Sequence, residues 1–265
     1  MEISRVKTLG LDTLNFGDWA SFVAWAGKAR PVGKEEFYGN ISSAEALRMA
    51  VEGWQAGTER INHFTDLFLD KLTPFLQVDE YFYDVTGQDW DISRVLEGEP
   101  ECWINAEQVE VKAPANQVIR LVVQAQALAV VSPEAMMWKG ASVVALVALL
   151  EKSRRRVQID LAFYNSGLSK GMHLMNIPLK AAGDNSDYAK LAFALAHPAC
   201  FRHLGFGVME KEGFGGKGSS QNLTKGEEMD ILVPKGEPWD DKASCEAWIL
   251  KELAGQGIEL NLGDK

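Results

Sequence analysis

The sequence has 265 residues, 46% of them hydrophobic, and a formal net charge of −10. This apolar content suffices for a large buried core, whereas no apolar run approaches the roughly 20 residues of a membrane-spanning helix. We therefore expect a globular protein without a membrane partner, and the net acidity argues against a protein that coats nucleic acid by charge alone.

The N-terminal residues and the cysteines bear on the compartment. Residues 1–7 lack the apolar core of a signal peptide. Cys102, Cys200 and Cys245 are scattered and odd in number, which fits a reducing compartment better than a disulfide framework. We therefore expect a cytoplasmic protein whose thiols are packed.

Charge is distributed unevenly along the chain. Residues 1–117 contain 10 Lys and Arg against 20 Asp and Glu, whereas residues 118–265 contain 17 of each. Within the second half, residues 152–225 contain 11 basic and 5 acidic residues, a balance of +6. Any contact with a polyanion is therefore expected in that segment.

Three helices are predicted in the first quarter of the chain. The first begins at Asp18 and ends near Pro31, and the second begins at a capping box formed by Ser42 and Glu45 and ends near Gly57. The third carries an apolar stripe at helical spacing, followed by a proline: Ile61, Phe64, Phe68, Leu72 and Pro74.

Strand signals follow these helices. A strand and turn are predicted at Tyr81–Gly87, a short helical turn at Ile92–Gly98, and strands at Cys102–Asn105 and Val109–Lys112. The turn Ala113–Asn116 leads directly into the next strand, which predicts an antiparallel hairpin that joins the main sheet.

Residues Val118–Tyr164 indicate a strand, a helix and a strand. Val118–Val131 alternates with one fully apolar face, Ser132 and Pro133 are typical of a helix start, and Val157–Tyr164 is a second strand. This βαβ unit requires parallel strands.

The alternation continues to the end of the sequence. Strands are predicted at 173–179, 229–234 and 257–262, helices at 184–198 and 240–254, and a glycine-rich irregular segment at 206–228. The fold class is therefore α/β, with a mixed, largely parallel sheet flanked by helices, of the von Willebrand A-like or Rossmann-like type. Residues 1–117 form an acidic extension of helices and a hairpin packed on a βα core of residues 118–265.

Ligands of open α/β sheets bind beyond the carboxyl ends of the strands, so a site is expected in the loops at Ser132, 165–171, 180–187 and 234–241. The sheet resembles a von Willebrand A-type domain, in which Asp-x-Ser-x-Ser after the first strand holds a metal. The corresponding residues 130–134 lack the first Asp. We therefore expect no metal there.

Two further motifs resemble ligand sites. Gly213–Ser220 is similar to a phosphate loop, but Gly218 stands where Ser or Thr must follow the lysine and no helix follows, so a mobile loop without nucleotide is favoured. His197–His203 has metal-capable side chains, but core packing is favoured because Pro198 disturbs the helix. We expect no cofactor.

Acidic and aromatic residues offer a further candidate. Asp89 and Asp91 are paired carboxylates around Trp90, for which an acidic turn is the favoured interpretation. Trp90 and Trp239 are predicted in loops, where a nucleic-acid base could stack.

Basic residues in the +6 segment are the candidates for nucleic-acid binding: Arg154, Arg155, Arg156, Lys211 and Lys217. Single strands are held by phosphate contacts and by stacking on aromatic side chains. The three arginines could also be only the charged end of a helix.

Several short stretches together resemble a tailed-phage family of unassigned function: residues 37–46, 53–57, 83–87, 97–102 and 138–141. The similarity covers about residues 37–180 and, more weakly, the C-terminal third. Within that family the chain is similar to the single-stranded-DNA-binding transcription accessory proteins of lytic podophages that encode a two-subunit RNA polymerase. The resemblance implies a non-enzymatic protein of the host-cell cytoplasm that holds single-stranded DNA and recruits the phage RNA polymerase.

Two other classes of function stay open. The glycine-rich loop and the strand-end loops would serve a nucleotide-binding protein or an enzyme. The acidic half would serve a scaffold or an inhibitor that binds only protein. The sequence does not indicate an oligomeric state.

Overall fold

The computed structural model describes residues 2–8, 10–30, 35–72, 77–110, 117–126, 131–167, 171–214, 220–236 and 239–258. These residues form an α/β protein with a six-stranded mixed sheet, a set of helices and a separate three-stranded sheet. The α/β class with helices flanking a mixed sheet is thus confirmed.

The main sheet has the strand order β1-β2-β8-β7-β6-β9. Its strands are β1 (Ile3–Thr8), β2 (Leu11–Phe16), β6 (Val118–Gln124), β7 (Arg156–Gly167), β8 (Gly171–Lys180) and β9 (Ile231–Val233). The pairings β2–β8, β6–β7 and β6–β9 are parallel, whereas β1–β2 and β7–β8 are antiparallel. The predicted parallel βαβ unit is confirmed, and the sheet as a whole is partly antiparallel.

The helix α5 (Pro133–Lys152) begins as the sequence predicts. The Ser132 side chain accepts a hydrogen bond from the backbone N–H of Ala135, and Pro133 occupies the first turn. The helix is buried along most of its length, which is why its apolar residues are not confined to one stripe. Contrary to the expectation from the sequence, it is long and apolar enough to span a membrane, but 72% of that apolar window is buried inside the protein. This is consistent with the core helix of a soluble protein.

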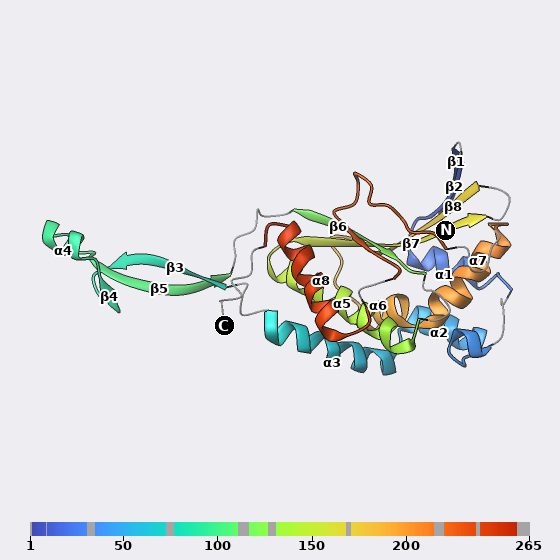
Figure 1. Ribbon diagram of the computed structural model, residues 1–265, viewed down its shortest axis with the longest axis horizontal. Coiled ribbons are helices and arrows are strands. Elements are labelled where there is room, and N and C mark those ends of the chain that lie inside the picture. Colours follow the sequence, from blue (N-terminus) through green and yellow to red (C-terminus); the bar gives the residue numbers. More distant parts are fainter. Residues whose placement is uncertain are drawn as a thin grey trace.

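The other helices lie with α5 on one side of the sheet (Figure 1). They are α1 (Trp19–Ala26), α2 (Ser43–Glu52), α3 (Gln55–Leu72), α6 (Tyr188–Ala196), α7 (Phe206–Lys211) and α8 (Lys242–Gly255). Helices α3, α6 and α8 pack against α5, and α2 packs against α6. Figure 1 shows α5, α6 and α8 close to the sheet, with α2 and α3 forming an outer layer.

Helix starts were the most predictable feature. Asp18 and Ser42 are the N-caps of α1 and α2, and each side chain accepts a hydrogen bond from the third helical backbone N–H. The Glu45 carboxylate of the predicted capping box accepts from Arg48. The stripe of α3 is confirmed, with Ile61, Phe68 and Leu72 fully buried. However, α2 ends at Gly53 rather than near Gly57, because Gly53 has φ +89°, which glycine adopts without steric strain.

Four elements differ from the prediction. Strands β1 and β2 were not predicted, because β1 is exposed along most of its length and so lacks an alternating apolar pattern. Phe206–Lys211 is the helix α7 rather than an irregular segment, because Phe206, Val208 and Met209 bury one face. The predicted final strand at 257–262 lies mostly outside the described residues, and neither Gly257 nor Ile258 is in a strand.

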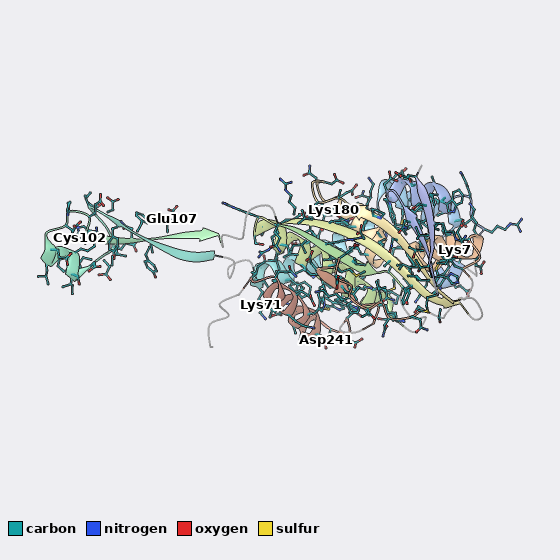
Figure 2. All side chains as sticks on the ribbon, turned by 90° about the horizontal axis from the view of Figure 1, so that it is seen from above. Lys7, Lys71, Cys102, Glu107, Lys180 and Asp241 are labelled. Atoms are coloured by element: carbon teal, nitrogen blue, oxygen red, sulfur yellow. The ribbon has the colours of Figure 1, made fainter. Side chains whose placement is uncertain are left out.

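The second sheet belongs to an arm, defined here as residues 77–110. It contains β3 (Gln77–Asp84), β4 (Asp89–Trp90), α4 (Ile92–Glu97) and β5 (Trp103–Glu110), with antiparallel strand order β3-β5-β4. Figures 1 and 2 show the arm projecting from the rest of the molecule, which we call the body.

The predicted hairpin between 109–112 and the strand at Val118 is wrong, although its turn at 113–116 lies outside the described residues. Strand β5 pairs with β3 and β4, whereas both edges of β6 are already occupied, by β7 and β9. The antiparallel hairpin that extends the main sheet is instead β1–β2. Division of the chain at residue 117 stays a prediction.

A close helix contact offers a test of the core. A Cβ added at Gly140 of α5 would lie 2.8 Å from Cβ of Ala196 and 3.2 Å from Cδ1 of Ile61. We expect Gly140→Ala to lower the free energy of unfolding by about 1–3 kcal/mol, because overpacking outweighs the helix propensity of alanine. Urea denaturation measures this change.

Gly255→Ala is the matched control, because a Cβ at Gly255 meets no atom within 4 Å. This variant should be neutral or should stabilise the protein by up to about 1 kcal/mol. An equal change in the free energy of unfolding for Gly140→Ala and Gly255→Ala would show that α5 and α6 can move apart without loss of stability.

Candidate functional site

The four predicted basic residues that the structure describes do not form one cluster. Arg154 is exposed in the left-handed region (φ 62°), and Arg156 is exposed at the start of β7. Arg155, between them, is buried, and its guanidinium donates to the backbone oxygen of Gln256 (2.7 Å) and to Oγ of Ser153 (3.1 Å). Burial lowers the pKa of Arg155. Arg155 therefore ties the end of α5 to the end of α8.

The lysine candidates lie elsewhere. Lys217 lies outside the described residues. Lys211 is exposed, with its Nζ 3.8 Å from the ring centroid of Trp25, whose indole N–H donates to the adjacent Glu212. Glu212 lines a hollow with His173, which lies beside Asn165 in the sheet. Asn165 follows Arg156 by nine positions along β7, or about 30 Å of strand. The arginines and Lys211 are therefore at opposite ends of the sheet.

The carboxyl ends of β6, β7 and β9 lie at the same edge, because these three strands are parallel. The chain leaves β6 through α5 to β7 on one side, whereas β9 lies on the other side of β6. This is a topological switch point, where α/β sheets commonly bind ligands. The predicted loops after β6, β7 and β9 belong to this edge. The predicted loop 180–187 does not, because β8 runs antiparallel to β7.

Buried polar side chains occupy this edge. Gln126 is fully buried, donates to Oδ1 of Asn165 (2.6 Å) and accepts from the backbone N–H of Tyr164 (2.9 Å). Gln124 accepts from the backbone N–H of Leu223 (3.1 Å) and donates to the carbonyl of Gln221. The segment after the glycine-rich loop is thereby held over the ends of the strands.

Lys139 is the titratable group of this network. It is 5% exposed, and its Nζ donates to the backbone oxygen of Gln124 (2.6 Å). Burial lowers its pKa to about 7. A lysine partly neutral near pH 7 can act as a base or a nucleophile, but a buried lysine bound to a carbonyl is also a common structural feature. Lys139 is not among the site residues predicted from the sequence. Its signal is a single charge in the otherwise uncharged run 135–150.

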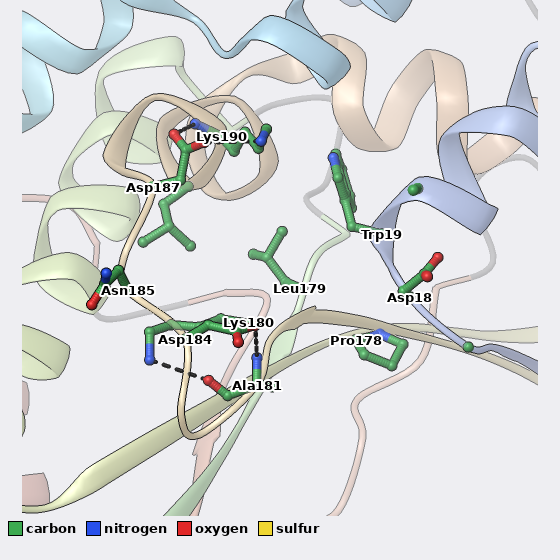
Figure 3. Close-up of a pocket in the computed structure, with 13 residues that line it drawn as sticks. Asp18, Trp19, Pro178, Leu179, Lys180, Ala181, Asp184, Asn185, Asp187 and Lys190 are labelled. Atoms are coloured by element: carbon green, nitrogen blue, oxygen red, sulfur yellow. Dashed lines mark hydrogen bonds and ion pairs between the residues drawn. The ribbon is translucent and has the colours of Figure 1, made fainter.

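The loop after β8 lines a cavity of about 510 Å³ at the opposite edge of the sheet (Figure 3). Lys180 is buried there, pairs with Glu151 (2.9 Å) and donates to the carbonyls of Val157 (3.0 Å) and Ala181 (3.3 Å). Asp18 and Asp187 cap α1 and α6. The charged groups of the cavity are thus engaged in holding the fold, and most of its remaining lining is apolar.

The segment His197–His203 is part of the core, as the sequence predicts. His197 is buried against Trp54 and Phe193, and its Nδ1 accepts from the backbone N–H of Ala199 (3.1 Å). Burial lowers the pKa of His197 to about 4 and raises the pKa of the Cys200 thiol. Among the described residues, no group of three or more His, Cys, Asp or Glu could hold a metal.

The two candidate stacking tryptophans have different environments. Trp239 is 3% exposed and packs on Trp248 with ring centroids 4.9 Å apart, so its prediction as a stacking platform is wrong. Trp90 is 56% exposed on the arm and stacks on Trp103 at 5.9 Å. Asp91 near it caps α4, as expected of an acidic turn.

These features define an α/β protein with a mixed sheet, an occupied switch point and a projecting acidic arm. Residues 8–259 match the family described as Domain of unknown function (DUF7192), and the chain belongs to this family. This agrees with the expected membership in a family of unassigned function. No curated protein and no solved structure matches the chain.

The lowered pKa of Lys139 predicts a pH-dependent stability. Between about pH 7 and 10 the unfolded chain binds a proton at Lys139 that the folded protein does not, so stability rises with pH in this window. We expect the unfolding free energy of the wild type, minus that of Lys139→Met, to increase by up to about 1.4 kcal/mol per pH unit. Urea denaturation at pH 7.5 and 9.5 measures it.

Lys251→Met, at an exposed position of α8, is the control and should change stability equally at both pH values. A pH-independent difference for Lys139→Met would mean that Lys139 keeps its charge in the folded protein.

Proposed function

We propose that this chain is a non-enzymatic accessory protein that binds a protein partner and single-stranded DNA, and that its partner is a phage RNA polymerase. The observation that carries the proposal is the projecting arm, whose aromatic and aliphatic side chains are exposed. Tyr81 is 69% and Leu96 82% exposed. Exposed apolar clusters of this kind are typical of surfaces that bind proteins.

The resemblance supplies the rest of the proposal. Phage origin, the host-cell cytoplasm as the location and the polymerase as the partner are taken from the likeness to podophage transcription accessory proteins. A von Willebrand A-like or Rossmann-like core belongs to the same proposal, as does the division into residues 1–117 and 118–265.

For DNA binding we retain Arg154 and Arg156, which are exposed near the amino end of β7. Arg155 is withdrawn, because its guanidinium is buried and bound to the end of α8. Lys211 would contact a different part of the bound DNA, because it lies roughly 30 Å from the two arginines. Lys217 stays a candidate outside the described residues.

The two arginines give a quantitative test. Each phosphate contact contributes about 0.7 to the dependence of log K on log salt for a single strand. Arg154→Ala combined with Arg156→Ala should therefore weaken binding of a labelled single-stranded oligonucleotide and flatten the slope by about 1.4. Fluorescence anisotropy at several salt concentrations measures both effects.

The control is Arg60→Ala combined with Lys7→Ala, which removes the same charge from exposed positions on α3 and β1. If both double variants bind the oligonucleotide with the same affinity and the same salt dependence, Arg154 and Arg156 are only solvated charges at the end of a helix. Recovery of the polymerase from infected cells by the tagged chain, without DNA binding, would favour the protein-only scaffold.

An enzyme or nucleotide-binding protein is the second candidate, favoured by Lys139 at the switch point between β6 and β9. The hydrogen bonds of this region indicate a structural role for Lys139. Its Nζ donates to the carbonyl of Gln124, and the side chains of Gln124 and Gln126 already bind the backbone around it. ATP or GTP with magnesium should therefore leave the melting temperature unchanged. A rise of several degrees would favour this candidate over the accessory protein.

A further inference from the structure

The arm carries nearly all of the net charge of the protein. Residues 77–110 contain ten acidic residues and a single basic one, Arg94, a balance of −9 out of −10 for the chain. The other residues together have a balance of only −1. The acidity assigned to residues 1–117 is therefore concentrated in one projecting element (Figure 2).

Arg94 does not neutralise the rest of the arm. Its guanidinium lies 4.1 Å from the ring centroid of Tyr83 and 3.3 Å from a carboxylate oxygen of Glu99. Within the described residues no Lys or Arg pairs with the exposed Asp84 or Asp89. Uncompensated carboxylates on a thin element attract cations strongly at low salt.

One face of the arm sheet is apolar and hollowed. The strand register places Tyr81 opposite Ala106 and Tyr83 opposite Ile104, on the same face of the sheet. These four side chains line a hollow of about 460 Å³ together with Phe82, Gln88 and Asp89. Tyr83 is 44% exposed, and its hydroxyl donates to Asp91 (3.0 Å). The face is large enough for apolar side chains of a partner.

One edge of the arm sheet is open. In the described part of the chain, β3 pairs only with β5, so the backbone donors and acceptors along its outer edge have no strand beside them. An eight-residue edge of this kind is a template for an added strand. A second copy of the arm is a poor occupant, because it would bring the same −9 charge to this edge.

We propose that the β3 edge of the arm binds an extended, lysine- or arginine-rich segment of a partner protein, which adds to the sheet as a further strand. Apolar side chains of that segment lie on Tyr81 and Tyr83, and its cations lie on the other face of the sheet, beside the exposed carboxylate of Asp84 on β3. This inference rests on the proposed function, because it specifies how the accessory protein holds its protein partner.

Binding of a defined peptide to the full chain tests the proposal. The probe is a fluorescein-labelled ten-residue peptide of alternating lysine and valine. The matched peptide has proline in place of the two central valines, which keeps the charge but removes backbone donors. We expect the first peptide to bind at least tenfold more tightly, as measured by fluorescence anisotropy.

Variants of the full chain locate the site. Asp84→Asn keeps a side-chain acceptor for the backbone N–H of Val85, and should weaken binding several-fold and reduce its salt dependence. Tyr81→Ala should also weaken binding. The control, Asp66→Asn at an exposed position of α3, removes the same charge from the body and should have no effect.

Three outcomes would overturn the proposal: equal binding of both peptides, which indicates attraction by charge alone; no binding of either peptide; or dimerisation of the chain through the arm, seen by sedimentation and lost in Tyr81→Ala. The polymerase pull-down separates this inference from the proposed function. If the arm variants recover the polymerase as well as the wild type does, the docking inference fails and the proposed function stands. If the wild type recovers none, the proposed function fails.

Discussion

Burial of α5 is the constraint on which the body depends. An apolar helix without a polar face is stable in water only if neighbours cover it on every side. The sheet covers one side, and α3, α6 and α8 cover the others. Gly140 lets α5 approach Ala196 of α6 closely, and Lys139 enters the core only because its amine reaches the carbonyl of Gln124. Both features follow from the need to enclose this helix.

The separation of charge is the second organising feature. The arm holds −9 of the net charge, whereas the body is almost balanced. A basic protein can therefore approach the arm while a polyanion approaches the body. Repulsion between the polyanion and the carboxylates of the arm is screened beyond about 10 Å at moderate salt. The exposed Arg154 and Arg156 belong to the body, and Asp84 and Asp89 belong to the arm.

The switch point of the sheet has the position of an α/β ligand site but is occupied by the protein itself. Gln124, Gln126 and Asn165 hydrogen-bond to one another or to the segment that follows the glycine-rich loop. Buried amides that satisfy each other stabilise a single conformation.

The sequence by itself determined the local elements: the caps at Asp18, Ser42 and Ser132, the stripe of α3 and the parallel β6–α5–β7 unit, because these depend on neighbouring residues in the chain. Only the tertiary structure decided which strands pair. It placed β5 in the arm with β3 and β8 antiparallel to β7, because pairing partners depend on contacts between distant residues. For the same reason, the sequence could identify Arg154, Arg155 and Arg156 as basic but not reveal that the middle one is buried, nor that the acidic residues gather on one projecting arm.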